Sequence, residues 1–307
     1  MDNNSILSHT DRALQTVPGV REIARTYALW AVGISLGTQL ISYIAGAMTA
    51  NTGGLGGIGM RSILETVQVL CMYLSMILLP FLLYGHMTAG LNTARGIESP
   101  KRVLFQGFRK FGPFLRLALL WTLLIFAVSM AASNAAAILY MLIPGSLQTT
   151  LSLQNSMADP NALMDPQFAM ELIGKLWPMY VIFGLLLIVL LIPLAYRLRL
   201  VTLRILDGEK RVLLAMFTSW KSMRGHCKQL FFLDLQFWGY YALTVLASVV
   251  AYGDQLLGIT GDVAYWVCIL LSLGIQILAT ILYLPRLHTA QAQFYLTHYI
   301  TESQTQS

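Results

Sequence analysis

The sequence predicts an all-α, polytopic membrane protein in which six transmembrane helices form three hairpins, with amphipathic helices at the membrane interface. The first observation behind this prediction is composition. Of the 307 residues, 56% are hydrophobic and 11% are charged, whereas soluble domains carry about 25% charged residues. The second is that whole blocks lack charge, at 117–143, 176–196 and 263–285. As helices rising about 1.5 Å per residue, such blocks cross a hydrocarbon core of about 30 Å.

The pattern divides the chain into a cytoplasmic amphipathic lead-in over 1–25, a six-helix transmembrane domain over 26–285, and a cytoplasmic amphipathic tail over 286–307. Apolar residues of the lead-in lie roughly on one face of a helix that Pro18 is expected to break, which predicts an interfacial helix. The expected spans are 27–49, 66–91, 113–143, 176–196, 230–251 and 263–285. Pro80 is expected to bend the second of them.

Two connectors on one side of the predicted membrane carry few basic residues. A polar connector covers 144–171, and a glycine-rich one covers 51–60. The glycine-rich connector matches the GxGxxG pattern from Gly54 to Gly59. Because the dinucleotide-binding form of that pattern needs a preceding strand and a βαβ unit, we interpret this connector as a flexible loop.

The basic residues predict the orientation. Eighteen of the 20 Lys and Arg residues lie on one side of the predicted membrane, and only Arg61 and Lys175 lie on the other. The positive-inside rule therefore places both termini in the cytoplasm. The same distribution favours topology and contact with anionic lipids over nucleic-acid binding.

The stretch Ser219–Tyr241 shows how the basic connectors meet the spans. Its first half is basic, and its second half enters an apolar run over 230–251 whose only charge is Asp234. A similar layout at 105–121, and a fainter one at 20–30, suggests three repeated hairpins; the alternative is that any basic connector beside a membrane has this layout. The cations expected to contact anionic headgroups are Arg109, Lys110, Lys221, Arg224 and Lys228.

Asp234 is the most informative single charge, because intramembrane charges are costly and are usually paired. Arg116 is expected at a similar depth at the start of the third span. We therefore expect an Arg116–Asp234 ion pair between two hairpins. The alternatives are that Asp234 reaches the interface or pairs with Lys228.

Asn134 in the third span and Gln276 in the sixth are the other polar candidates. Hydrogen bonding between helices is the ordinary explanation for such residues. The alternative is that, with Asp234, they line a polar path for a substrate.

No catalytic, cofactor or metal site is predicted. The three cysteines have no CxxC or Cys/His spacing, so neither zinc nor a disulfide framework is expected. His86, His226 and His288 fall near the cytoplasmic ends of helices without an HxxxH or HExxH pattern, and we interpret them as interfacial. The alternative is that they converge on a metal or a proton relay. No GxSxG motif, Ser-His-Asp order or paired carboxylate supports hydrolysis.

Two groups of residues in the C-terminal half carry a family resemblance. The first is Ser219, Met223 and Gly225, followed by Leu230-Phe231, Leu233-Asp234-Leu235, Phe237 and Gly239-Tyr240; the second is Tyr283, Pro285, Ala290, Phe294-Tyr295 and His298. Together they resemble the signature of a bacterial integral membrane family catalogued as domain of unknown function 975. The resemblance implies six spans and a bacterial cytoplasmic membrane, and it supplies no catalytic residues.

Three functions remain open at this point. The favoured one is a non-catalytic accessory or scaffold component, associated with transport or interacting with lipids, a protein partner or a second copy. A small transporter or channel with a polar path through the third, fifth and sixth spans is the first alternative. A membrane-embedded enzyme acting on lipids is the second, and it needs ionisable groups that converge at one interface.

Overall fold

The computed structural model describes residues 2–17, 19–51, 55–146, 148, 166–256, 258 and 261–305, and helices are the only regular structure in these ranges. The chain divides into two compact units. The first comprises Met1–Pro113 with Leu200–Ser307, and the second is Phe114–Arg199. Because their relative placement is not determined, each unit is described by itself.

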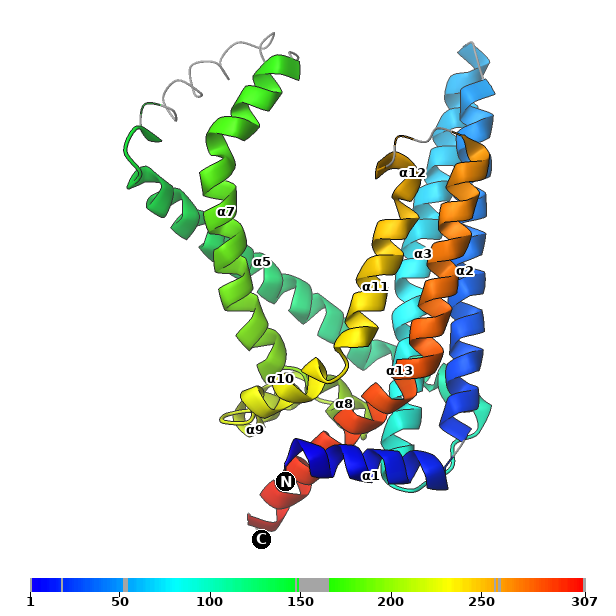
Figure 1. Ribbon diagram of the computed structural model, residues 1–307, viewed down its shortest axis with the longest axis vertical. Coiled ribbons are helices and arrows are strands. Elements are labelled where there is room, and N and C mark those ends of the chain that lie inside the picture. Colours follow the sequence, from blue (N-terminus) through cyan, green and yellow to red (C-terminus); the bar gives the residue numbers. More distant parts are fainter. Residues whose placement is uncertain are drawn as a thin grey trace. The chain divides into compact units, whose positions relative to one another are not determined.

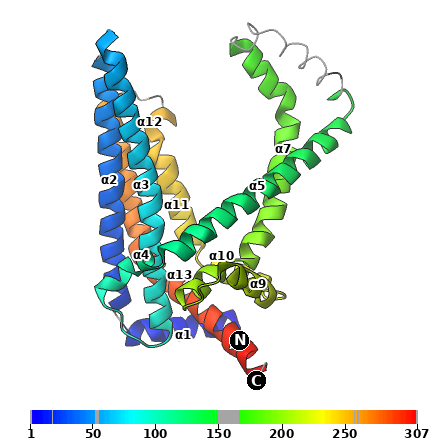
Figure 2. The same cartoon turned by 180° about the vertical axis from the view of Figure 1, so that it is seen from behind.

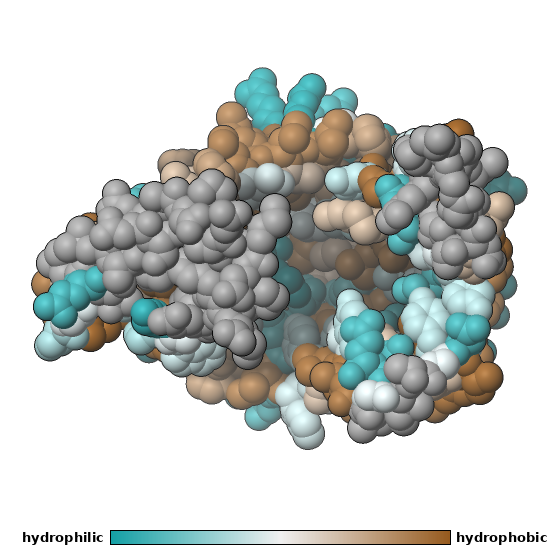
Figure 3. Space-filling view, turned by 90° about the horizontal axis from the view of Figure 1, so that it is seen from above, coloured by the Kyte–Doolittle hydropathy of each residue, from teal (hydrophilic) through white to brown (hydrophobic). Residues whose placement is uncertain are grey.

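Four helices lie side by side in the first unit (Figures 1 and 2). They are α2 (Gly19–Asn51), α3 (Leu55–Ala94), α11 (Trp238–Ala251) and α13 (Asp262–Thr305), and α13 packs against each of the other three. Many large apolar side chains of these helices are exposed, among them Leu29, Leu70 and Leu270, and apolar residues appear along parts of the rim in the end-on view of Figure 3. This is the arrangement expected of helices whose outer faces meet lipid.

Shorter helices gather at the end of the first unit where α1 lies (Figure 1). They are α1 (Asn3–Thr16), η1 (Lys101–Phe105), α4 (Gln106–Arg109), α8 (Val201–Leu206), α9 (Val212–Ser222) and α10 (Cys227–Leu235). We call these helices, with the adjoining ends of α2, α3 and α13, the basal layer. The single-turn α12 (Gly253–Leu256) follows α11.

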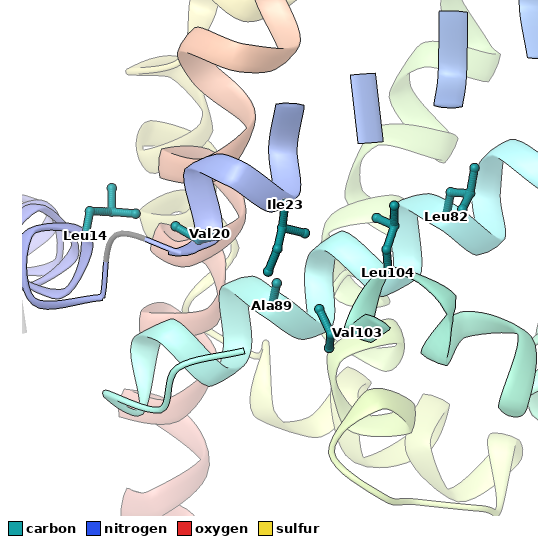
Figure 4. Close-up of a cluster of buried hydrophobic side chains, with 7 residues drawn as sticks. All are labelled: Leu14, Val20, Ile23, Leu82, Ala89, Val103 and Leu104. Carbon is teal, nitrogen blue, oxygen red and sulfur yellow. The ribbon is translucent and has the colours of Figure 1, made fainter. Parts of the chain in front are cut away.

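The basal layer has an apolar core of its own, shown in Figure 4. Its members come from α1, α2, α3 and η1: Leu14, Val20, Ile23, Leu82, Ala89, Val103 and Leu104. Asp2 caps the start of α1 by accepting the backbone N–H of Asn3, and Ile6 and Leu14 of this helix are buried. The amphipathic lead-in therefore forms a helix, as predicted, but its apolar face packs on α13, α3 and α10 of the same chain.

Two glycines allow α3 to lie against η1 and α4. A Cβ at Gly85 would come 1.9 Å from the carbonyl oxygen of Leu104, and a Cβ at Gly107 would come 2.1 Å from that of Phe81. No real Cβ tolerates such distances to backbone, so any side chain at either position would force the two elements apart.

The second unit contains α5 (Phe111–Met141), whose first residues belong to the first unit, and α7 (Pro166–Arg197). The Tyr140 hydroxyl of α5 donates a hydrogen bond of 3.1 Å to the carbonyl oxygen of Lys175 in α7. Ala132, Ala136 and Tyr140 are buried on α5. Both helices are long and apolar enough to cross a membrane.

Five described helices meet the length and composition of a span: 19–48, 62–94, 111–141, 174–206 and 262–298. The all-helical, multi-span prediction is therefore confirmed, whereas the number six depends on how α10 and α11 are counted. The expected single helix over 230–251 is wrong, because α10 and α11 meet at a bend of 64°. With 14 residues, α11 extends only about 21 Å, less than a hydrocarbon core of about 30 Å.

The break lies at Gln236 and Phe237. The backbone N–H groups of both residues bond to carbonyls three residues back, those of Leu233 and Asp234. Phe237 itself leaves the helical region at φ −101° and ψ 22°, with its side chain buried. The last turn of α10 is thereby tightened and closed before α11 begins.

Several predicted boundaries also shift. The loop expected at 51–60 is wrong over 55–60, because α3 begins at Leu55; residues 52–54 lie outside the described residues. Glycine costs only about 1 kcal/mol relative to alanine in a helix, and extension of a helix that has already nucleated outweighs that cost. The loop expected at 144–171 is wrong over 166–171, because α7 begins at Pro166; residues 147 and 149–165 lie outside the described residues. Helix α13 continues through Pro285 into the tail.

Candidate functional site

The basal layer brings together the two groups of residues that carry the family resemblance. The buried members of the first group lie on α9 and α10 and in the turns that follow these helices: Ser219, Met223, Leu230, Leu233, Asp234 and Phe237. The buried members of the second group lie on α13: Pro285, Ala290, Phe294 and Tyr295. A Cβ at Gly239 would lie 2.8 Å from the Tyr283 hydroxyl. The two groups therefore pack against each other, and their spacing reflects contacts between α9–α11 and α13.

Asp234 is 6% exposed and accepts a hydrogen bond of 3.0 Å from the side-chain amide of Gln291, which is also buried. This contact satisfies a carboxylate oxygen that would otherwise be costly to bury. Gln291 was not predicted, because it lies in the tail that the sequence assigned to an amphipathic surface. Arg116 is an exposed residue of the second unit, so the Arg116–Asp234 ion pair stays a prediction.

Asp207 forms a second polar centre, which sequence analysis missed. Its carboxylate pairs with Arg95 at the end of α3 and accepts a hydrogen bond of 2.9 Å from the Tyr295 hydroxyl. The Lys110 ammonium donates to the carbonyl oxygens of Ile205 and Leu206 at 2.8 and 2.6 Å. Three separated chain segments are therefore tied to the C-terminal end of α8.

Burial lowers the pKa of Lys110, and the nearby Asp207 carboxylate partly opposes that effect. The lysine donates to carbonyl groups at the end of α8 that have no partner within that helix. It was predicted to contact anionic headgroups, but the structure engages its ammonium within the protein. Nothing in the sequence marked Asp207 among the other charges of its connector.

A histidine pair lies where α3 meets α13. The Nδ1 atoms of His86 and His288 are 2.8 Å apart, so one ring donates and the other accepts. His86 is fully buried and His288 is 6% exposed, so the two rings face the interior of the protein, while their level at the membrane interface stays a prediction. Gly90 permits the approach, because a Cβ there would lie 3.1 Å from the His288 backbone. Among the described residues, no group of three His, Cys, Asp or Glu side chains could hold a metal ion.

Gln276 lines a cavity of about 230 Å³ between α2, α3, α11 and α13. Hydroxyl groups contribute much of the polar lining, from Tyr27, Ser35, Tyr240, Thr244 and Thr280. Asn134 lies on α5 of the second unit, and its amide donates a hydrogen bond of 2.8 Å to the Met130 carbonyl of its own helix. Gln276 therefore lies beside several hydroxyl groups within its unit. The Asn134 amide has its hydrogen-bond acceptor on its own helix.

The remaining predicted headgroup contacts lie on the outside of the basal layer. Arg109 ends α4, Lys221 lies in the last turn of α9, and Arg224 and Lys228 flank the start of α10. None of these four cations forms an ion pair or hydrogen bond through its side chain with a described residue. All four are exposed, and we call this set of cations the basic rim.

Comparisons with protein-family models, with curated proteins and with solved structures found no match for this chain.

Proposed function

We propose that this chain is a non-catalytic, multi-pass component of a bacterial cytoplasmic membrane, with both termini inside, that acts as an accessory or scaffold. Its basic rim would bind anionic headgroups and a protein partner or second copy. The proposal includes membership of the family that the signature resembles.

The observation that supports this proposal most directly is the pairing pattern of cations in the first unit. Lys110 and Arg95 are engaged inside the basal layer, by the α8 carbonyls and by Asp207. The four cations of the basic rim remain outside without a described partner. A cation that faces an anionic membrane surface contributes about 1 kcal/mol of attraction, so four of them make a substantial, salt-sensitive binding surface.

A photo-crosslinking amino acid at Phe217, an exposed position on α9, would test the proposal in native membranes. We expect crosslinks to anionic phospholipid and to one defined protein, and we expect both to be lost in a K221Q/R224Q/K228Q variant. The matched control is R12Q/R25Q, which removes one arginine from α1 and one from α2. Equal crosslinking in the basic-rim variant and the control would contradict the proposal.

A small transporter is the second candidate, and the cavity beside Gln276 favours it. In a chain with its three cysteines replaced, a new cysteine at Gln276 would then react with a membrane-impermeant reagent. A cysteine at Leu278, which is 52% exposed on the same helix, should face lipid and stay protected. Protection of both positions would exclude an aqueous path through this cavity.

A further inference from the structure

A cavity of about 360 Å³ lies where α1, the start of α2 and α13 meet, away from the basic rim. Its lining combines charged residues, Asp11, Arg21 and Arg286, with apolar ones, Leu14, Ile281 and Leu282. No predicted site residue belongs to it.

The cavity lies at the level where α13 changes from apolar to polar. The uncharged block over 263–285 ends at Pro285, and the next residue is Arg286. Leu282, one turn earlier, is 59% exposed and lies within that uncharged block. Arg286 of the lining therefore follows directly after the uncharged block, whereas Ile281 and Leu282 belong to that block, which is long enough to cross a hydrocarbon core.

The charges in the cavity are not balanced. Arg286 and Asp11 form an ion pair, with Nη2 and Oδ2 2.7 Å apart. Arg21 is exposed and has no ion pair or side-chain hydrogen bond with any residue that the structure describes. One carboxylate and two guanidinium groups leave one unmatched positive charge, in a lining that also contains apolar residues.

We propose that this cavity binds a diacyl glycerophospholipid, with its phosphodiester between Arg21 and Arg286 and an acyl chain along Ile281 and Leu282. A phosphodiester carries one negative charge, which matches the unmatched charge of the cavity. Guanidinium groups present several donors in a planar fork suited to phosphate oxygens. The site goes beyond the proposed function, because it needs neither the basic rim nor a protein partner.

Native mass spectrometry of the full-length, delipidated protein in detergent tests the site. The probes are phosphatidylglycerol, diacylglycerol without the phosphate, and glycerol phosphate without the chains. We expect saturable binding of phosphatidylglycerol alone, because the charged and apolar parts of the lining must both be filled. R21Q should weaken that binding roughly tenfold, the loss expected for one charge-assisted contact.

R25Q is the matched control, because Arg25 is exposed one turn further along the same helix and does not line the cavity. It should bind phosphatidylglycerol as the wild type does. D11N raises the net charge of the cavity and should bind at least as tightly as the wild type, which separates electrostatic capture from a loss of local structure. Equal binding by R21Q and R25Q would overturn the proposal, as would glycerol phosphate binding as tightly as the lipid.

Discussion

Helix α13 of the first unit and helix α7 of the second are similarly apolar, yet they are packed very differently. In the most apolar window of α13, 28% of residues are buried, whereas in that of α7 none is. The glycines show the same contrast. A Cβ at Gly85, Gly90 or Gly239 would have atoms of another element within 3.1 Å, but a Cβ at Gly174 or Gly184 of α7 would have none within 4 Å, as is also the case at Gly33 and Gly37 of α2.

The comparison separates two properties that hydropathy combines. The length of its apolar segment decides whether a helix can cross a membrane. Both α7 and α13 are long and apolar enough to do so. Association between membrane helices depends instead on small residues that permit close approach and on polar groups that bond across the contact. The first unit has both, in its close glycines and in the Asp234–Gln291 and His86–His288 contacts.

The largest expected effect is at Gly85. In G85A the new methyl group would collide with the Leu104 carbonyl, whose backbone is fixed in η1, so we expect a loss of about 3 kcal/mol or more of folding free energy. Thermal unfolding in detergent, followed by size-exclusion chromatography, measures it. The matched control is G33A in α2, where a Cβ meets nothing within 4 Å. Equal melting temperatures for the two variants would show that α3 and η1 do not pack as closely as described.

Asp234 is expected to have the next largest effect. D234A removes the acceptor of the buried Gln291 amide, which should cost about 1–3 kcal/mol, since an unsatisfied buried donor pays its full desolvation penalty. A double-mutant cycle with Q291A should give a coupling energy of about 0.5–3 kcal/mol. Additive losses would mean that the hydrogen bond contributes nothing to stability.

A parallel cycle tests the predicted pair of Asp234 with Arg116. If the two side chains form an ion pair, R116Q and D234N should be coupled, and a charge-swapped double variant should recover stability lost in each single exchange. If instead the cycle is additive, Gln291 is the functional partner of this carboxylate. Unfolding in detergent at low salt gives the most sensitive readout, because screening is then smallest.

The sequence predicted the existence of spans well and their interruption poorly, for a physical reason. Apolar length is a local property, so uncharged blocks such as 263–285 identify helices directly. The bend between α10 and α11 falls at Gln236 and Phe237, where neither proline nor glycine marks it. It is associated with burial of Phe237 and with the contact of Asp234 to a residue 57 positions away, which no local pattern records.

The candidate residues divide in the same way. Asp234 could be selected because a lone charge in an apolar run is costly wherever it lies. Its partner, and the pairing of His86 with a histidine 202 positions away, depend on how α3, α10 and α13 meet. Asp207 was missed because an acidic residue in a basic connector has the sequence context of a solvated residue. Only the fold shows that Arg95 and Tyr295 contact its carboxylate.

A smaller effect is expected within the second unit. Y140F removes the hydroxyl that donates to the Lys175 carbonyl, which should cost about 0.5–1.5 kcal/mol. The control is Y180F, an exchange at an exposed tyrosine of α7, which should leave stability unchanged. If Y140F and Y180F melt together, the contact does not hold α5 to α7.

The smallest effect, and the sharpest test of the contrast between units, is at Gly184. G184A adds a methyl group where no neighbouring atom lies within 4 Å, so it should be neutral or stabilise α7 by up to about 1 kcal/mol through its higher helix propensity. The same exchange at Gly85 should abolish the close contact of α3 with η1. A destabilising G184A would reveal a partner that approaches this face of α7 as closely as the elements of the first unit approach one another.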